Sequence, residues 1–192
     1  MSDKDQIRVF FALRPDEGAV QQLLKRIDGL RSRGWEKCAR FSGEQNLHLT
    51  LRFVGEVAPE ALEKLLAGAK EIAAELRPFD YQIGGTTLFP RVSRARIVAA
   101  KIESPPPELK TLARRLDRLA VECGLAEEKF PYRPHITLAR LQAAKSRPRL
   151  AAQGNFTIQQ HASEFVIYRS TLNPEEAEYE PMESFPFGEQ TG

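Results

Sequence analysis

The sequence predicts one domain of mixed strands and helices, built from two similar halves. The segment HLTL at 48–51 returns 87 residues later as HITL at 135–138, in a chain with only three histidines. A strand-like and a helix-like segment repeat at the same offset, and no low-complexity segment or linker interrupts the 192 residues. Repetition at one spacing indicates structurally related halves, and the missing linker indicates that they share one domain, 1–192.

The first half opens with a strand and a helix. IRVFFAL at 7–13 is apolar and rich in β-branched and aromatic residues, which favour strands. Arg14-Pro15-Asp16 breaks this run, and AVQQLLKRIDGL at 19–30 then places apolar residues at helical spacing.

The histidine strand of the first half follows a loop that carries Trp35. NLHLTLRFVGEV at 46–57 alternates polar and apolar residues, as a half-buried strand does. Residues two apart on a strand share a face, so alternation places His48, Thr50 and Arg52 together.

The middle of the chain continues with helices and strands. Pro59 opens a helix over 59–76, and a second helix over 108–124 closes at Gly124. Two strands, 79–88 and 95–102, lie between these helices in the sequence.

The second histidine motif lies in YRPHITLAR at 132–140, which reads as another strand. A polar, basic loop over 142–153 separates it from two further strand-like segments, GNFTIQQ at 154–160 and EFVIYRSTL at 164–172. The residues after these segments are expected to form a loose tail.

The 87-residue offset relates the halves element by element. Strand 7–13 maps onto 94–100, and helix 16–33 maps onto 103–120. A pseudo-twofold axis would relate the two halves. If the histidine strands lie side by side about it, four polar side chains project into one cleft: His48, Thr50, His135 and Thr137.

Such a pair of histidines suits in-line displacement at phosphorus. Histidine titrates near neutrality, so one ring can act as base while the other acts as acid. Threonine hydroxyls can donate hydrogen bonds to the phosphate oxygens, and this chemistry needs no metal or other cofactor. One His-x-Thr is an ordinary pattern on a half-buried strand, but its repetition at equivalent places favours a functional cleft. His161 is not part of a His-x-Thr motif and is interpreted as an ordinary surface or strand residue.

The offset also pairs Phe53 with Arg140, five residues after each histidine. A phenyl ring offers a base a stacking surface, and a guanidinium can grip phosphate oxygens. Strict alternation turns both side chains away from the histidines, so their use at the site requires a bulge or twist. Arg52, which alternation places on the histidine face, is the alternative phosphate ligand.

Composition limits the other function classes. The net charge of +2 is too small for a protein that coats nucleic acid by charge alone. Cys38 and Cys123 lie far apart without metal-ligand spacing, and buried free thiols are the simplest interpretation. Without a signal peptide or an apolar run long enough for a membrane span, we expect a cytoplasmic protein that does not bind a membrane. A monomer is the default expectation.

The motifs resemble those of the two-histidine phosphoesterase superfamily. The paired HLTL and HITL, the opening RVFFALRP and the closing Tyr179-Glu180-Pro181 carry this resemblance, which covers nearly the whole chain. Within it, the chain is most similar to the RNA 2',3'-cyclic phosphodiesterases, also called 2'-5' RNA ligases. The resemblance implies a bilobal α+β fold with an antiparallel sheet and packed helices in each lobe and an active-site cleft between them. It implies hydrolysis of RNA 2',3'-cyclic phosphate ends to 2'-phosphates, with His48, Thr50, His135 and Thr137 as catalytic tetrad. It also favours His48 as acid and His135 as base, although the near-symmetry of the motifs leaves the reverse order open.

Three alternatives stay open at this point. The same chemistry could act on a small cyclic nucleotide or nucleotide-sugar, or the cleft could bind RNA ends without catalysis. Weak 2'-5' ligation could accompany hydrolysis, since it reverses the opening of such an ester. An RNA enzyme needs a basic track, for which clustering in the sequence favours the following residues: Arg91, Arg94, Arg96, Lys145, Arg147 and Arg149.

Overall fold

The computed structural model describes residues 6–142, 156–173 and 177–188, and these ranges contain nine strands and three α-helices. The strands are β1 (Ile7–Leu13), β2 (Ala39–Phe41), β3 (Leu49–Val57), β4 (Phe79–Phe89), β5 (Ile97–Glu103), β6 (His135–Leu141), β7 (Thr157–Ala162), β8 (Glu164–Leu172) and β9 (Ala177–Pro186). The helices are α1 (Glu17–Arg31), α2 (Pro59–Ala74) and α3 (Pro107–Glu122), with short 3-10 turns η2 (Trp35–Lys37), η3 (Glu44–Asn46) and η4 (Val92–Arg94).

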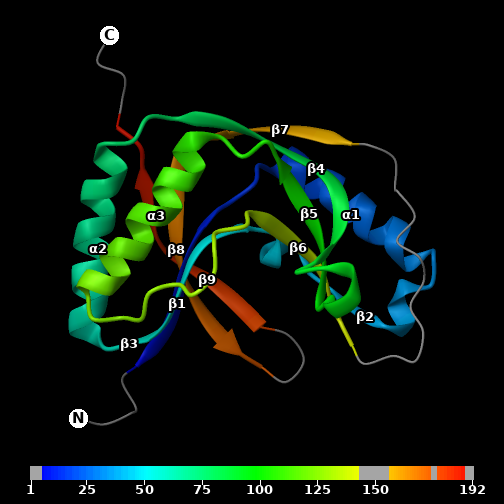
Figure 1. Cartoon of the computed structure of the whole chain (residues 1–192), viewed down its shortest axis with the longest axis horizontal. Helices are drawn as coiled ribbons and strands as arrows, with labels where there is room; N and C mark the ends of the chain where they lie inside the picture. Colours follow the sequence, from blue (N-terminus) through cyan, green and yellow to red (C-terminus); the bar gives the residue numbers. More distant parts are fainter. Residues whose placement is uncertain (1–5, 143–155, 174–176, 189–192) are drawn as a thin grey trace.

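All nine strands belong to one curled sheet, which Figure 1 shows with the helices against it. The strand order is β7-β4-β5-β6-β3-β1-β8-β9, with β2 paired to β6, and every pairing is antiparallel. Antiparallel strands combined with separate helices make an α+β fold, as the sequence predicts.

The sheet is narrowest between β3 and β6, where Leu49 pairs with Ile136. On one side of this junction lie β3-β1-β8-β9, and on the other β6-β5-β4-β7. The helices cross over: α1 follows β1 but packs against β6 and β7, whereas α3 follows β5 but packs against β3 (Figure 1). The repeated units of the sequence therefore interleave in space, and each half of the sheet is covered by a helix from the other repeat.

The helix ends follow from local chemistry. Asp16 caps α1 by accepting a hydrogen bond of 2.7 Å from the Ala19 backbone N–H. Pro59 and Pro107 begin α2 and α3, where a missing N–H costs nothing. Gly124 ends α3 with φ +86°, a left-handed conformation that favours glycine.

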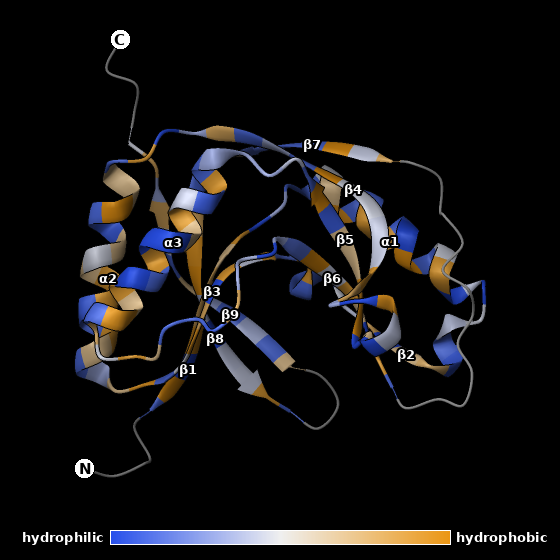
Figure 2. Cartoon of the chain, in the orientation of Figure 1, coloured by the Kyte–Doolittle hydropathy of each residue, from blue (hydrophilic) through white to orange (hydrophobic). Residues whose placement is uncertain are grey.

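Each helix turns one apolar face to the sheet. Leu109, Leu112 and Leu116 of α3 recur at helical spacing and are fully buried. Figure 2 shows the same division, with hydrophobic stripes toward the sheet and hydrophilic ones toward solvent. The main core therefore lies between helices and sheet, which leaves the opposite face of the central strands for the site.

The structure corrects two sequence predictions. The expected loose tail contains β9, which pairs with β8 along its length. The predicted loop that carries Trp35 contains β2, which pairs with β6. The predicted basic loop falls largely on 143–155, outside the described residues, and so do Lys145, Arg147 and Arg149. Within the described ranges, no helix is both long and apolar enough to span a membrane.

Candidate active site

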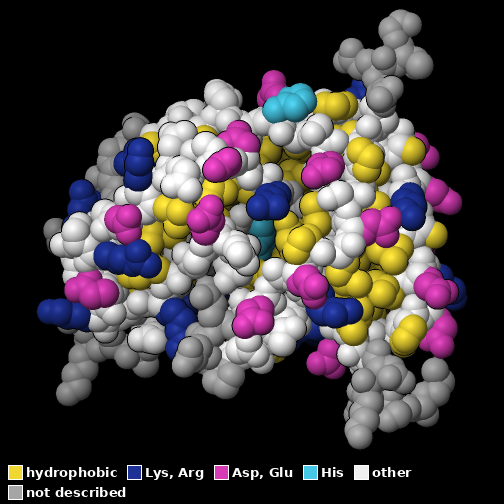
Figure 3. Space-filling view, turned by 180° about the vertical axis from the view of Figure 1, so that it is seen from behind, with side chains coloured by type: hydrophobic (Ala, Val, Ile, Leu, Met, Phe, Trp, Pro, Cys, Tyr) yellow, Lys and Arg dark blue, Asp and Glu magenta, His cyan; other side chains and the backbone are white. Residues whose placement is uncertain are grey.

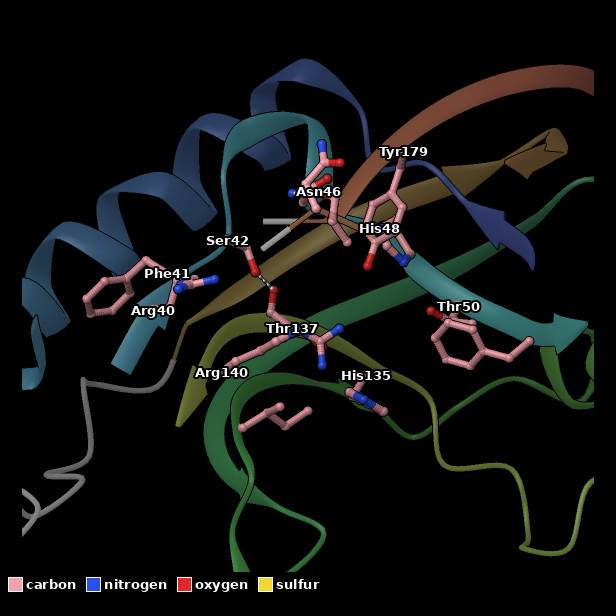
Figure 4. A pocket seen from close by; sticks show the side chains of 14 residues that line it. Arg40, Phe41, Ser42, Asn46, His48, Thr50, His135, Thr137, Arg140 and Tyr179 are labelled. Carbon is pink, nitrogen blue, oxygen red and sulfur yellow. Dashed lines mark hydrogen bonds between the residues drawn. The ribbon is translucent and has the colours of Figure 1, made fainter. Parts of the chain in front are cut away.

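The junction between β3 and β6 brings the two histidine motifs together. Because Leu49 pairs with Ile136 in antiparallel register, His48 lies across from Thr137, and Thr50 lies across from His135. All four side chains line one cavity, seen in Figure 4. A local twofold axis through the Leu49–Ile136 pair relates the motifs, as the repeat predicts.

Each histidine strand carries a bulge at the last residue of its motif. In the β1–β3 pair, Ala12 is opposite Thr50 and Phe11 is opposite Arg52, so Leu51 has no partner residue. In the β5–β6 pair the register skips Leu138 in the same way. An extra residue reverses the alternation directly beyond it, so the next two side chains of each strand change face.

The bulges bring Phe53 and Arg140 back to the histidine face. Both residues line the cavity, and the Phe53 side chain is 49% exposed there. The sequence makes the use of these residues conditional on such a bulge, and this geometric condition is met on both strands.

The placement of Arg52 on the histidine face is wrong, because the same bulge turns it away. Its side chain is only 5% exposed and points to α3. Its Nε lies 2.7 Å from Asp117 Oδ1, and its Nη1 lies 2.9 Å from Glu128 Oε1. Arg52 also donates hydrogen bonds to the Phe53 and Ala126 carbonyls. It therefore ties β3 to the residues around α3.

Both histidine rings are oriented by a backbone carbonyl two residues before them. His135 Nδ1 lies 2.7 Å from the Arg133 oxygen, and the Asn46 carbonyl holds the His48 ring. Since a carbonyl only accepts, Nδ1 of His135 carries the proton and leaves Nε2 as the basic nitrogen.

Burial lowers the pKa of both histidines. The pKa of His48 falls from 6.5 to about 4, mainly by burial, with further lowering by the Arg140 and His135 charges against the raising effect of the Asn46 carbonyl. The pKa of His135 is lowered by burial and by the Arg133 and Arg140 cations, against the raising effect of the Arg133 carbonyl. Both rings are therefore neutral at pH 7 in the ligand-free site.

Aromatic side chains surround His48 on the face of the sheet that carries the cavity. Its ring centroid lies 4.8 Å from that of Phe10, 5.2 Å from Tyr179 and 6.1 Å from Tyr168. His135 instead stacks on Phe89 at 4.2 Å. Figure 3 shows a histidine ring at the bottom of a central hollow, beside a basic side chain.

Several cavity residues escape the sequence prediction. Arg40 lines the cavity from β2. Ser42 Oγ donates a hydrogen bond of 2.9 Å to the Thr137 carbonyl, the dashed line of Figure 4. Asn46 Nδ2 donates one of 3.1 Å to Ala177, which holds the start of β9, and thereby Tyr179, at the cavity. Only Tyr179 has a signal in the sequence, as part of the closing Tyr-Glu-Pro.

Other predicted residues lie away from the cavity. His161 is exposed on β7 and pairs with Asp80 at 2.7 Å. Arg91, Arg94 and Arg96 are exposed around η4 and do not line the cavity. Cys38 is buried, but Cys123 only partly so, and both are free thiols. Among the described residues, no cluster of three or more His, Cys, Asp or Glu could hold a metal ion.

Comparison with known proteins places this chain in a family. A model of the 2'-5' RNA ligase superfamily matches residues 16–172. The RNA 2',3'-cyclic phosphodiesterase of Methanothermobacter thermautotrophicus is 30% identical over 185 residues, which cover 94% of this chain and 98% of that protein. The phosphodiesterase of the same name from Thermus thermophilus is 33% identical over 189 residues, covering 93% and 89%. Escherichia coli LigT complexed with 3'-AMP superposes with a TM-score of 0.81 at 26% identity, over 96% of this chain and 99% of LigT. The chain belongs to the 2'-5' RNA ligase superfamily.

Proposed function

We propose that this protein hydrolyses RNA 2',3'-cyclic phosphate ends to 2'-phosphates. The observation that carries the proposal is the register that gathers two His-x-Thr motifs around one cavity lined by Arg140. The names of the relatives, RNA 2',3'-cyclic phosphodiesterases, support the substrate class.

The two histidines divide the proton chemistry. His135 Nε2 takes a proton from water, whose oxygen attacks the phosphorus and forms the new P–O bond. The bond between phosphorus and the 3'-oxygen breaks on the opposite side, and His48 gives its proton to that oxygen. The products are a 2'-phosphomonoester and a free 3'-hydroxyl.

The other polar groups hold the phosphate. Thr50 and Thr137 donate hydrogen bonds to the non-bridging oxygens, and the Arg140 guanidinium offsets their negative charge. Phe53, exposed at the rim, offers a ring on which the terminal base stacks.

Because both histidines have low pKa values in the free site, the bound substrate must help to keep the acid protonated. The acid must carry a proton, and in the free site the pKa of His48 is about 4. A cyclic phosphate brings a negative charge between the rings and thereby favours the protonated form. Protonation of His48 is thus coupled to substrate binding.

Incubation with an RNA that ends in a 2',3'-cyclic phosphate, in the presence of a chelator, tests this function. A 2'-phosphate end is expected. A 3'-phosphate end, turnover of small cyclic nucleotides alone, or binding without turnover would contradict the proposal. An RNA with a 5'-hydroxyl added to the same reaction tests ligation, because that hydroxyl can replace water as the nucleophile.

A further inference from the structure

A second hollow adjoins the cavity on the side of His135. It lies between the first turns of α3, the segment before β6, the first half of β3 and the end of β4. We call it the α3 groove, and its walls include Phe53, Phe89, Lys110, Arg114, Phe130 and Arg133. Thr50, Phe53 and His135 line both hollows, so the groove continues directly from the site of chemistry.

The α3 groove presents positive charge. Lys110 and Arg114 are exposed one turn apart on α3, and neither forms an ion pair with any residue in the described ranges. The third cation, Arg133, lies with its guanidinium 4.7 Å from the Phe89 ring centroid and donates a hydrogen bond of 3.1 Å to the Pro90 carbonyl.

The carboxylates of the groove are already engaged. Asp117 and Glu128 both lie within ion-pair distance of the buried Arg52. Asp117 also accepts a hydrogen bond of 3.2 Å from the Glu128 backbone N–H. Their negative charges therefore neutralise mainly Arg52. Lys110 and Arg114 remain available to an anionic ligand.

Exposed aromatic rings accompany these cations. The Phe130 side chain is 81% exposed, and Phe53 stands where the groove meets the cavity. Large apolar side chains are costly to leave in water, whereas bases stack on them favourably. Cations interleaved with exposed rings are typical of surfaces that bind single-stranded nucleic acid.

The opposite rim of the cavity has the reverse charge. The hollow on that side is lined by Glu44, Glu178 and Glu180, and none of the described residues in its walls is basic. Phosphates of a bound chain are repelled there and attracted into the α3 groove. Charge therefore assigns a direction to a polynucleotide whose end occupies the cavity.

We propose that the α3 groove binds the nucleotides on the 5' side of the terminal cyclic phosphate. Lys110 and Arg114 contact the preceding phosphate, and Phe130 stacks on a preceding base. This inference rests on the proposed function and makes the enzyme selective for oligonucleotides over mononucleotides. Arg91, Arg94 and Arg96, the part of the predicted basic track that falls on described residues, line neither the groove nor the cavity.

The test compares a mononucleotide 2',3'-cyclic phosphate with a trinucleotide that bears the same end. The wild-type protein is expected to show a higher kcat/KM on the trinucleotide. In the double variant Lys110→Gln/Arg114→Gln, the ratio of kcat/KM on the trinucleotide to kcat/KM on the mononucleotide should fall by about tenfold at low salt. Phe130→Ala should lower this ratio of kcat/KM values by about fivefold or more. Arg118→Gln is the matched control, since Arg118 is exposed one turn further along α3 and lies outside the groove.

The outcomes separate this inference from the proposed function. Equal kcat/KM on both substrates, or equal losses on both in the double variant, would overturn the groove and leave the hydrolysis intact. If no cyclic phosphate is hydrolysed, binding of a fluorescent trinucleotide with a 2'-phosphate end replaces the rate. Weaker binding in the double variant than in Arg118→Gln supports the groove, and equal binding overturns it.

Discussion

The strands β3 and β6 share one backbone plan and differ in what surrounds it. Each has a histidine at its start, which is His48 just before β3 and His135 as the first residue of β6, and a carbonyl two residues earlier holds each ring. Each also has a threonine two residues after the histidine and a bulge at the fourth residue of the motif. Yet several aromatic rings enclose His48, whereas His135 stacks on one ring and has Arg133 nearby in addition to Arg140, whose charge acts on both histidines. The backbone therefore positions the two histidines in the same way, and only the surrounding side chains can make one of them an acid and the other a base.

The asymmetry continues beyond the bulges. The residue four positions after the histidine is Arg52 on β3, which is clamped to Asp117 and Glu128, and Ala139 on β6, which is buried without charge. The next residue is Phe53 on one strand and Arg140 on the other. One strand therefore supplies a ring and the other a cation to the same cavity.

Removal of either histidine should produce the largest effect. His48→Ala and His135→Ala should each lower kcat by about a hundredfold to ten-thousandfold, the usual contribution of a general acid or base. Binding of a 2'-phosphate-ended RNA should weaken far less, because the threonines and Arg140 remain. Single-turnover rates and equilibrium binding of the two variants measure this difference.

The leaving group distinguishes the two roles. An ester whose departing oxygen needs no proton should restore much of the rate to the variant that lacks the acid, and little to the variant that lacks the base. With His48 as acid, His48→Ala recovers. Recovery of His135→Ala instead would reverse the assignment.

The next largest effect concerns stability and the contrast between Arg52 and Ala139. Arg52→Ala places on β3 the alanine that β6 has at the equivalent position, Ala139. It also leaves Asp117 and Glu128 without their cation. We expect a loss of about 2–3 kcal/mol in the free energy of unfolding, since both carboxylates are partly exposed. Urea unfolding measures it.

Two other variants serve as controls for Arg52→Ala. Arg115→Ala removes an exposed pair with Glu75 and should cost less than about 1 kcal/mol. Arg140→Ala should lower kcat/KM with little change in unfolding. Equal unfolding midpoints for Arg52→Ala and Arg115→Ala would contradict the role of Arg52 as a clamp.

Much of this arrangement could be predicted from sequence, and the exceptions share a physical cause. The bounds of β1 and β8 match the predicted segments because their apolar composition is a local signal. The strand β9 carries charges and two prolines, which an edge strand tolerates, so only its pairing with β8 reveals it. The face of Arg52 was mispredicted because the bulge at Leu51 is defined by the register of β1, which is non-local.

The threonines test whether the two strands grip the phosphate equally. Thr50→Val and Thr137→Val each remove one hydrogen bond to a charged oxygen and should cost about 1–3 kcal/mol in kcat/KM. Thr→Ser at each position should restore most of the rate. Equal losses indicate a symmetric grip, whereas a loss at one position alone would show that one threonine does not contact the phosphate.

The smallest expected effect is a change in titration, and it examines the electrostatic difference directly. The Arg140 cation lowers the pKa of both His48 and His135, whereas the Arg133 cation lowers that of His135. Arg140→Gln should therefore raise both pKa values, and Arg133→Gln should raise that of His135 alone. Ring-proton NMR of the two histidines measures these changes. Because both rings are neutral at pH 7 and catalysis needs one proton on the pair, kcat/KM should rise as the pH falls below 7, and then fall as the second ring is protonated. Raising both pKa values moves this bell to higher pH, so Arg140→Gln should shift the optimum upward even as it lowers the maximal rate. An unshifted optimum with a lower maximum would show that Arg140 holds the phosphate without influencing the protons.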